Sequence, residues 1–287
     1  MAIVGTVREL WRYPVKSMGG ERVEHTTLGA AGLPGDRGWA VRDEAAGEIR
    51  GGKKLPVLML CSARYLHEPD GRAVPPAAIT LPDGATVTTD DAGIADRLSA
   101  LLGRTVTLWS VQPAENREHY RRGLPDKADM IEELRDIFGR LPDEPIPDLS
   151  VFPPEIMEFT SPLGTYFDAF PLHVLTTASL AALGADGEPE RFDRRRFRPN
   201  VLVETEAGLR GLVEAGWATR TLRIGEAVAA LQVPTARCSM IAQPQPGLAK
   251  DPQILRTVVR DADQNLGIYA TVTQPGAVRV GDPVELI

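Results

Sequence analysis

Cysteine and histidine are scarce in this sequence. Its 287 residues include two cysteines, Cys61 and Cys238, too few for a disulfide framework or for a zinc or iron–sulfur site with four cysteine ligands. The four histidines show no spacing typical of metal ligands; they are His25, His67, His119 and His173. The sequence also contains no internal repeat, GxGxxG motif, Walker sequence or HExxH pair. The commonest signatures of dinucleotide, nucleotide and zinc-protease chemistry are therefore absent.

Signals for export and membrane insertion are also missing. No basic segment followed by an apolar run stands at the N-terminus, and no apolar stretch approaches the length of a membrane span. We therefore expect a cytoplasmic protein that does not bind a membrane. The net charge of −7 argues against nucleic acid as a general partner, because nucleic-acid binding depends on many phosphate contacts. A single local basic pocket is still compatible with this charge.

Many short apolar runs separated by turn residues indicate a β-rich first part over residues 1–111. Strands are expected at 3–11, 23–28, 39–43 and 105–111, with a hairpin at 79–88. In the first of these, alternation places Ile3, Val7 and Trp11 on one side. One helix is expected after Asp90 or Asp91, ending at Gly103.

Residues 112–168 have a different composition. A helix is expected at 127–138, and the segment 141–147 carries too many prolines for regular structure. Such a stretch is an excursion from the β-rich fold. Two interpretations remain open, a decorated linker, which the composition slightly favours, and a lid or loop that faces a substrate.

The last part, residues 169–287, again consists mainly of predicted strands, at 172–175, 201–203, 221–224, 227–233, 267–273, 278–280 and 284–287. One helix should begin at Thr176 or Thr177, and another at Asp251 and Pro252. A closed or nearly closed barrel would leave the fewest exposed strand edges. The expected fold class is mainly β with some α, in two barrel-like domains joined by the excursion.

The stretch from Pro234 to Met240 contains the most reactive side chain of the sequence. Proline lacks the N–H needed for strand pairing, so the chain should leave the sheet at Pro234 and present Arg237 and Cys238 at the strand end. A neighbouring guanidinium favours the thiolate, which is both a nucleophile and a soft metal ligand. The alternative is a buried cysteine that only fills space.

Several short motifs, taken in order, resemble those of the MOSC-domain proteins, a family named for the molybdenum cofactor sulfurase C-terminal domain. The matching N-terminal β-barrel domain is also recognisable, and the resemblance covers nearly the whole chain except residues 112–165. The motifs are Tyr13-Pro14-Val15-Lys16-Ser17, Gly35-Asp36-Arg37-Gly38-Trp39, Phe197-Arg198-Pro199-Asn200, Arg237-Cys238, Leu266-Gly267-Ile268-Tyr269 and Val280-Gly281-Asp282-Pro283-Val284.

The resemblance implies a molybdenum cofactor bound between the two domains. In the amidoxime-reducing members of the family the motif cysteine is a molybdenum ligand, a metal-binding and catalytic role that would fall on Cys238. Other matching positions would hold the phosphate and pterin, through charge-assisted donors and an amide; they are Lys16, Ser17, Arg37, Arg198 and Asn200, with Arg237 beside the cysteine and Thr176 near the phosphate.

Each of these residues also has a purely structural interpretation. Lys16 could be a solvated charge, Arg37 could close a turn through Asp36, Arg198 could belong to a surface run of arginines, and Asn200 could satisfy a strand start. Lys53 and Lys54 match no motif and are expected to be solvated.

The stretch after Cys238 departs from the family pattern. Gln243 and Gln245 occupy positions that are acidic in the amidoxime-reducing members, and glutamine cannot transfer a proton. Asp251 is only a weak substitute.

The leading functional hypothesis is nevertheless an oxidoreductase that reduces small N-hydroxylated compounds. Because the sequence shows no flavin or iron–sulfur signature, such an enzyme would need a separate electron donor protein. An alternative is a carrier of the cofactor or of sulfur, with Cys238 as persulfide or transient ligand; no pyridoxal phosphate site is recognisable. A third is a scaffold that has lost the cofactor.

Overall fold

A closed β-barrel dominates the fold. The computed structural model describes residues 1–71, 73–184 and 189–287, and its largest sheet has the order β11-β10-β14-β13-β12-β16-β1-β2. Antiparallel pairing of β1 with β11 closes seven of these strands into a ring. The strands of the ring are β11 (Val201–Thr205), β10 (Leu172–Thr176), β14 (Asn265–Gln274), β13 (Ala227–Ala236), β12 (Thr221–Ile224), β16 (Pro283–Leu286) and β1 (Ala2–Arg12). This confirms the mainly β, barrel-containing fold class.

β1 lies in this barrel although it begins the chain, and its register differs from simple alternation. Irregularities between Ile3 and Gly5 and between Val7 and Glu9 shift its pairing. Such bulges reverse which side chains face inward. As a result Ile3 is 59% exposed while Val4, Val7 and Leu10 are buried, so the prediction that Ile3 and Val7 share one side was wrong.

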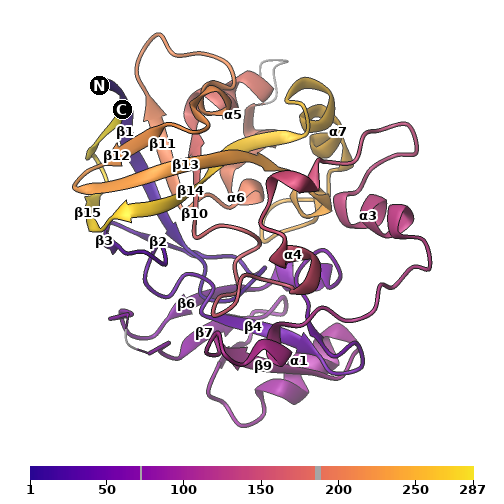
Figure 1. The fold of residues 1–287 in the computed structure, drawn as a ribbon. Helices are drawn as coiled ribbons and strands as arrows, with labels where there is room; N and C mark the ends of the chain where they lie inside the picture. The colour runs from indigo at the N-terminus through magenta and orange to yellow at the C-terminus, as the bar shows by residue number, and fades with distance from the viewer. Residues whose placement is uncertain (72, 185–188) are drawn as a thin grey trace.

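The rest of the first part forms a smaller unit below the barrel (Figure 1). Its two three-stranded sheets and one helix enclose a separate core that contains Leu58, Cys61 and Leu98. Burial raises the pKa of Cys61 to about 11, so this thiol is a core residue. The elements are β4 (Trp39–Asp43), β5 (Glu48–Ile49) and β9 (Val106–Ser110); β6 (Ser62–Tyr65), β7 (Ala77–Thr80) and β8 (Thr86–Thr88); α1 (Ile94–Leu102); and the 3-10 helix η1 (Pro56–Leu60).

The two β-rich parts share strands. β2 (Glu21–Val23) pairs with β1, and β3 (His25–Leu28) pairs with β15 (Gly276–Arg279) from the end of the chain. Domain boundaries at residues 111 and 168 therefore stay a prediction.

Residues 112–168 run along one side of the molecule, between the barrel and the smaller unit (Figure 1, magenta). They contain α2 (Arg117–Tyr120), α3 (Met130–Phe138), the 3-10 helix η2 (Leu149–Val151) and α4 (Glu155–Glu158). The predicted helix is confirmed, beginning at Met130. The Asp129 carboxylate accepts from the first turn of α3, and Gly139, at a φ of 62°, ends it.

The remaining helices, which include α5, α6 and α7, lie beside the barrel strands in the upper part of the molecule (Figure 1). Thr176 caps α5 and Asp251 caps α7, both as predicted. β13 does not stop at Pro234, however. It continues to Ala236 through two irregularities against β14, because bulges tolerate a proline that cannot donate. These helices are α5 (Thr177–Leu183), η3 (Pro189–Phe192), α6 (Arg194–Phe197), η4 (Val213–Trp217), η5 (Ser239–Ala242) and α7 (Pro252–Asp261).

Candidate cofactor site

A cavity of about 210 Å³ lies where the barrel, the smaller unit and residues 112–168 meet. Lys16, Ser17 and residues 51–54 line it from the smaller unit, Met240 lines it from the barrel, and the helix α3 covers it. Of the two interpretations of residues 112–168, the structure therefore favours the one in which they face a site.

Lys16 and Asp168 form a polar centre of the cavity wall. The Lys16 Nζ atom lies 3.0 Å from Asp168 Oδ1 and donates to the Tyr166 carbonyl at 2.7 Å, so Lys16 is buried and ion-paired. The Asp168 side chain is 44% exposed. Desolvation, which would raise its pKa, is therefore partial, and the charges of Lys16, Lys53 and Arg37 hold that pKa far below its usual range. No sequence motif pointed to Asp168.

Lys53 also belongs to this group. It lines the cavity and is half-buried. Burial tends to lower its pKa, yet the charges of Asp168 and Cys238 raise it. Lys54 is likewise partly buried and pairs with Asp126 at 2.9 Å and with Glu133. The expectation that Lys53 and Lys54 are solvated was wrong. The two glycines that precede them, Gly51 and Gly52, bring this part of the backbone into the cavity wall.

At Gly51 and Gly52, space allows no larger residue. A Cβ atom on Gly51 would lie 2.6 Å from Ser17 Oγ, and one on Gly52 would lie 3.0 Å from Met59 and 3.1 Å from Met240 Cε. Only glycine fits such a close approach of backbone to neighbouring atoms. The Gly51-Gly52-Lys53 sequence was the signal that sequence analysis missed, because the two glycines allow the backbone to bring Lys53 into the cavity wall.

Arg37 and Arg198 both stack on the Tyr13 ring. Their guanidinium carbons are 5.2 and 4.2 Å from its centroid, and Arg37 also pairs with Asp36. Ser17, Arg37 and Arg198 are three of the six non-glycine residues with positive φ in the described part of the chain, at 71°, 51° and 56°. Such backbone strain concentrates at functional sites. Arg198 is buried, and its Nη2 atom has no hydrogen-bond partner.

Cys238 follows the end of β13 and is half-buried. Next to it, Arg237 Nη2 donates to the Phe197 carbonyl at 3.1 Å and to His173 Nε2 at 3.0 Å, while its Nε atom is buried without a partner. Burial, and then the Arg237 charge, lower the pKa of His173 well below its usual value, so the ring is neutral. His173 joins the two arginine motifs, because its Nδ1 atom contacts the Arg198 carbonyl at 3.3 Å.

Asn200 and Thr176 have their polar groups engaged elsewhere. The Asn200 amide accepts from the His173 N–H at 3.1 Å and donates to Asp36 at 3.0 Å and the Trp11 carbonyl at 3.3 Å. Thr176 is buried at the opposite end of β10 from His173, where its hydroxyl donates to Glu214 at 2.7 Å. Asn200 thus fixes the strand entry beside Arg198. Of the predicted site residues only Lys16 and Ser17 line the cavity, and the others lie outside its wall: Arg37, Thr176, Arg198, Asn200, Arg237 and Cys238.

The stretch after Cys238 offers no free acid in place of the two glutamines. Asp251 caps α7 and accepts from one edge of the Arg191 guanidinium, from Nε at 2.5 Å and from Nη2 at 2.9 Å. The hydrogen bond from Arg191 is the main reason that the pKa of Asp251 is lowered. Gln245 is buried, with a side-chain nitrogen that lacks a partner. Asp251 therefore does not replace the missing acids.

Comparison with known proteins agrees with this architecture. The MOSC domain model matches residues 164–285, and the model of the MOSC N-terminal beta barrel domain matches residues 4–97. The chain belongs to the MOSC-domain proteins, and it combines both domains of that arrangement.

Curated relatives extend this similarity to the full chain. Mitochondrial amidoxime-reducing component 1 from Homo sapiens is 28% identical over 99% of this chain and 83% of its own length. Mitochondrial amidoxime reducing component 2 from Homo sapiens is 29% identical and that from Bos taurus 26% identical, each over 98% of this chain and 83% of its own length. Those relatives are mitochondrial by name, whereas a cytoplasmic location of this chain stays a prediction. No helix among the described residues has the length and apolar character of a membrane span.

Proposed function

We propose that this protein is a molybdenum-cofactor-dependent oxidoreductase that reduces small N-hydroxylated compounds. The observation that carries the proposal is the half-buried Cys238 thiol beside a cluster of cationic side chains at the junction of the two β-rich parts. We define this cationic cluster as Lys16, Arg37, Lys53, Arg198 and Arg237. The similarity to amidoxime-reducing components supports the reaction class.

The residues present fit such a cofactor. Arg198 Nη2 and Arg237 Nε are buried donors with no protein partner, and a buried donor left unpaired is costly. An anionic phosphate or a pterin edge would satisfy such donors. Cys238 would be the soft ligand to molybdenum, and Lys16, Arg37 and Arg198 would hold the phosphate and pterin. Ser17 would contribute its hydroxyl from the cavity wall, whereas Asn200 and Thr176 would act only by positioning the backbone.

The bound cofactor would supply the two-electron chemistry that removes oxygen from the substrate. The chain's own contribution is a thiolate, a positive field and a covered cavity. Asp168 balances Lys16 and Lys53 and stays ionised because its pKa is lowered, so it accepts hydrogen bonds and does not donate a proton. With no iron–sulfur set of four cysteines in the sequence, electrons would arrive from a separate donor protein.

Metal content tests this proposal directly. Protein freshly purified from cells that make the cofactor should contain stoichiometric molybdenum and should reduce an N-hydroxylated compound once an electron donor is supplied. Cys238→Ala should abolish turnover. Cys61→Ala removes the other thiol, from the core of the smaller unit, and should leave turnover intact. Full activity of Cys238→Ala would refute the scheme, and sulfur released by a reductant without turnover would favour a carrier instead.

A further inference from the structure

Glu133 presents an unpaired carboxylate oxygen in the wall of the cavity. The residue lies on α3, lines the cavity and is only 6% exposed. One of its oxygens, Oε1, pairs with Lys54, while Oε2 is buried and accepts no hydrogen bond. A carboxyl oxygen without a hydrogen-bond partner is costly to bury. The cavity therefore lacks one hydrogen-bond donor at this point.

The surroundings define what kind of molecule could supply that donor. The apolar part of the wall includes Leu134, Ile137 and Phe138 on the same segment and Met157 on α4. The wall also carries charged side chains besides Glu133: Lys16, Glu48, Arg50, Lys53, Lys54, Arg122 and Asp168. A volume of about 210 Å³ corresponds to about seven waters at about 30 Å³ each, or to one small organic molecule. Such a molecule would have an apolar body and an N–H-bearing end.

The charged groups near Glu133 leave this oxygen available. Lys54 is held by Oε1 and by Asp126. Arg122 also lines the cavity, but its Nη2 atom donates to the Ile156 carbonyl at 2.8 Å and the Phe159 carbonyl at 3.0 Å. Neither cation has a hydrogen bond to Oε2 in the described structure.

We propose that Glu133 is a specificity-determining residue that selects ligands carrying a cationic or strongly donating N–H group, which donates to Oε2. The proposal rests on the proposed function in placing the substrate in this cavity. It adds the requirement that the preferred substrates present an N–H donor toward α3, with their apolar body against Ile137 and Phe138.

Benzamidine is a suitable probe because it has an aromatic body and a cationic N–H end and contains no N–O bond. Its binding to the freshly purified full-length chain is measured by calorimetry for the wild type, Glu133→Gln, Glu132→Gln and Lys54→Met. In Glu133→Gln the new amide would turn its carbonyl toward Lys54 and its N–H₂ toward the ligand, so donor would face donor. Binding to this variant should weaken about tenfold or more. Glu132 is exposed on the same helix, and Glu132→Gln should bind like the wild type.

The Lys54→Met variant distinguishes two roles of Glu133, binding of the ligand and the ion pair with Lys54 that holds α3 in place. It breaks the same ion pair but leaves the carboxylate in place, so benzamidine should bind as tightly as in the wild type or more tightly. Equal loss in Lys54→Met and Glu133→Gln would overturn the proposal, as would wild-type affinity in Glu133→Gln or no binding to the wild-type protein. Because benzamidine is not reduced, these results stand even where no reductase activity is found.

A kinetic arm then connects the residue to turnover. For an N-hydroxylated amidine, Glu133→Gln should raise KM about tenfold with little change in kcat, while an N-oxide without N–H groups should show no change. An equal rise of KM for both compounds would contradict selection through the N–H group. Failure of the wild type to reduce either compound would count against the proposed function and leave the benzamidine result to decide the role of Glu133.

Discussion

Replacing Arg198 with methionine should weaken cofactor retention while leaving the cofactor-free fold almost unchanged. The substitution removes one hydrogen bond to the Met18 carbonyl and the stacking on Tyr13 at 4.2 Å, together costing about 1.5–3 kcal/mol. It also removes a buried donor without a partner, whose desolvation costs about 1–3 kcal/mol. These contributions nearly cancel, so the free energy of unfolding should change by at most about 2 kcal/mol.

Cofactor retention should respond differently, because the unpaired Nη2 atom would lose a charge-assisted bond to the ligand. A bond worth about 1.5–3 kcal/mol corresponds to roughly a 10- to 150-fold weaker affinity. Two measurements are made on the variant and on the wild type. The molybdenum content per protein after dialysis reports cofactor retention, and urea denaturation of the cofactor-free protein reports the free energy of unfolding.

Arg196 provides a matched control, since it belongs to the same arginine run and is also buried. Its guanidinium donates to the carbonyls of Ile241 at 3.4 Å, Gln243 at 3.2 Å and Ala249 at 2.7 Å. Its Nε atom, like Arg198 Nη2, is buried without a partner among the described residues, but Arg196 makes three hydrogen bonds there where Arg198 makes one. Arg196→Met should therefore destabilise the fold by about 2–5 kcal/mol. If Arg198→Met kept all its molybdenum but lost as much stability as Arg196→Met, Arg198 would be structural and the reasoning would be refuted.

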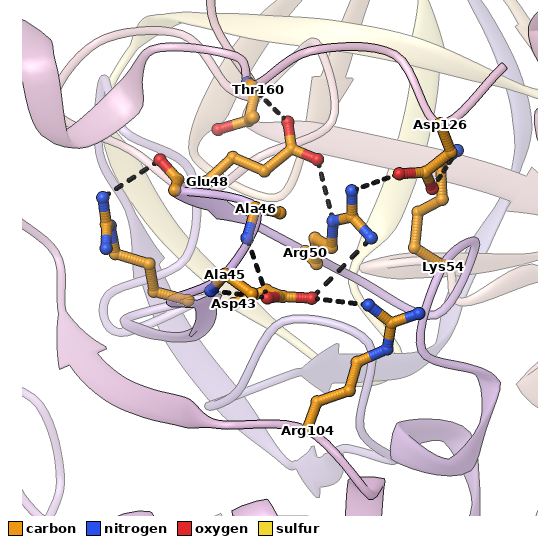
Figure 2. A network of polar contacts seen from close by, with 12 residues as sticks. Asp43, Ala45, Ala46, Glu48, Arg50, Lys54, Arg104, Asp126 and Thr160 are labelled. Carbon is orange, nitrogen blue, oxygen red and sulfur yellow. Dashed lines mark hydrogen bonds and ion pairs between the residues drawn. The ribbon is translucent and has the colours of Figure 1, made fainter.

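Two further predictions concern groups that position the site. The Arg50 side chain is 4% exposed and pairs with Glu48 at 2.9 Å and Asp126 at 2.6 Å (Figure 2), so Arg50→Met should lower the free energy of unfolding in urea by about 3–5 kcal/mol and speed hydrogen exchange in α3. Arg104 is a half-exposed partner of Asp43, and Arg104→Met should lower that free energy by under about 1 kcal/mol. Equal losses in the two variants would contradict a special role for the buried Arg50. The lowered pKa of His173 means that the unfolded chain takes up a proton near pH 6.5 while the folded chain does not, so stability is lost as pH falls below about 6.5. His173→Gln should reduce the difference between unfolding free energies at pH 7.5 and 5.5 by about 1.4 kcal/mol, and an unchanged pH profile would exclude a buried neutral ring.

Local signals allowed much of the fold to be predicted. The caps at Thr176 and Asp251 and the turn at Asp83-Gly84 each depend on neighbours in sequence, and the structure confirms them. The closure of the barrel could not be predicted in this way. It depends on β1 pairing with β11, almost two hundred residues away, and on bulges that shift the register by one residue and expose Ile3. Long-range pairing has no local sequence signature.

The candidate site divides along the same line. Cys238, Lys16 and the arginines stand in recognisable motifs, and the structure brings Lys16 and the arginines to the junction with Tyr13 and Asp168 between them. Asp168, Lys53 and Glu133 were missed because each acquires its role only when residues 112–168 fold over the cavity. The sequence around Asp168 and Glu133 is typical of any surface segment, whereas Lys53 follows the Gly51-Gly52 pair.

The charges of the site favour an anionic ligand, although the protein as a whole is acidic. The cationic cluster contributes five positive charges, and Asp36 and Asp168 contribute two negative ones, which leaves 5 − 2 = 3. A Cys238 thiolate would reduce the excess to two, and a phosphate monoester carries about −1.5 to −2. Buried charge of one sign is tolerated only when it is compensated, and the strained αL backbone of Arg37 and Arg198 adds to the cost. The site would therefore be close to electrically balanced when both the thiolate and an anionic ligand are present, which links Cys238 to the two arginines that stack on Tyr13.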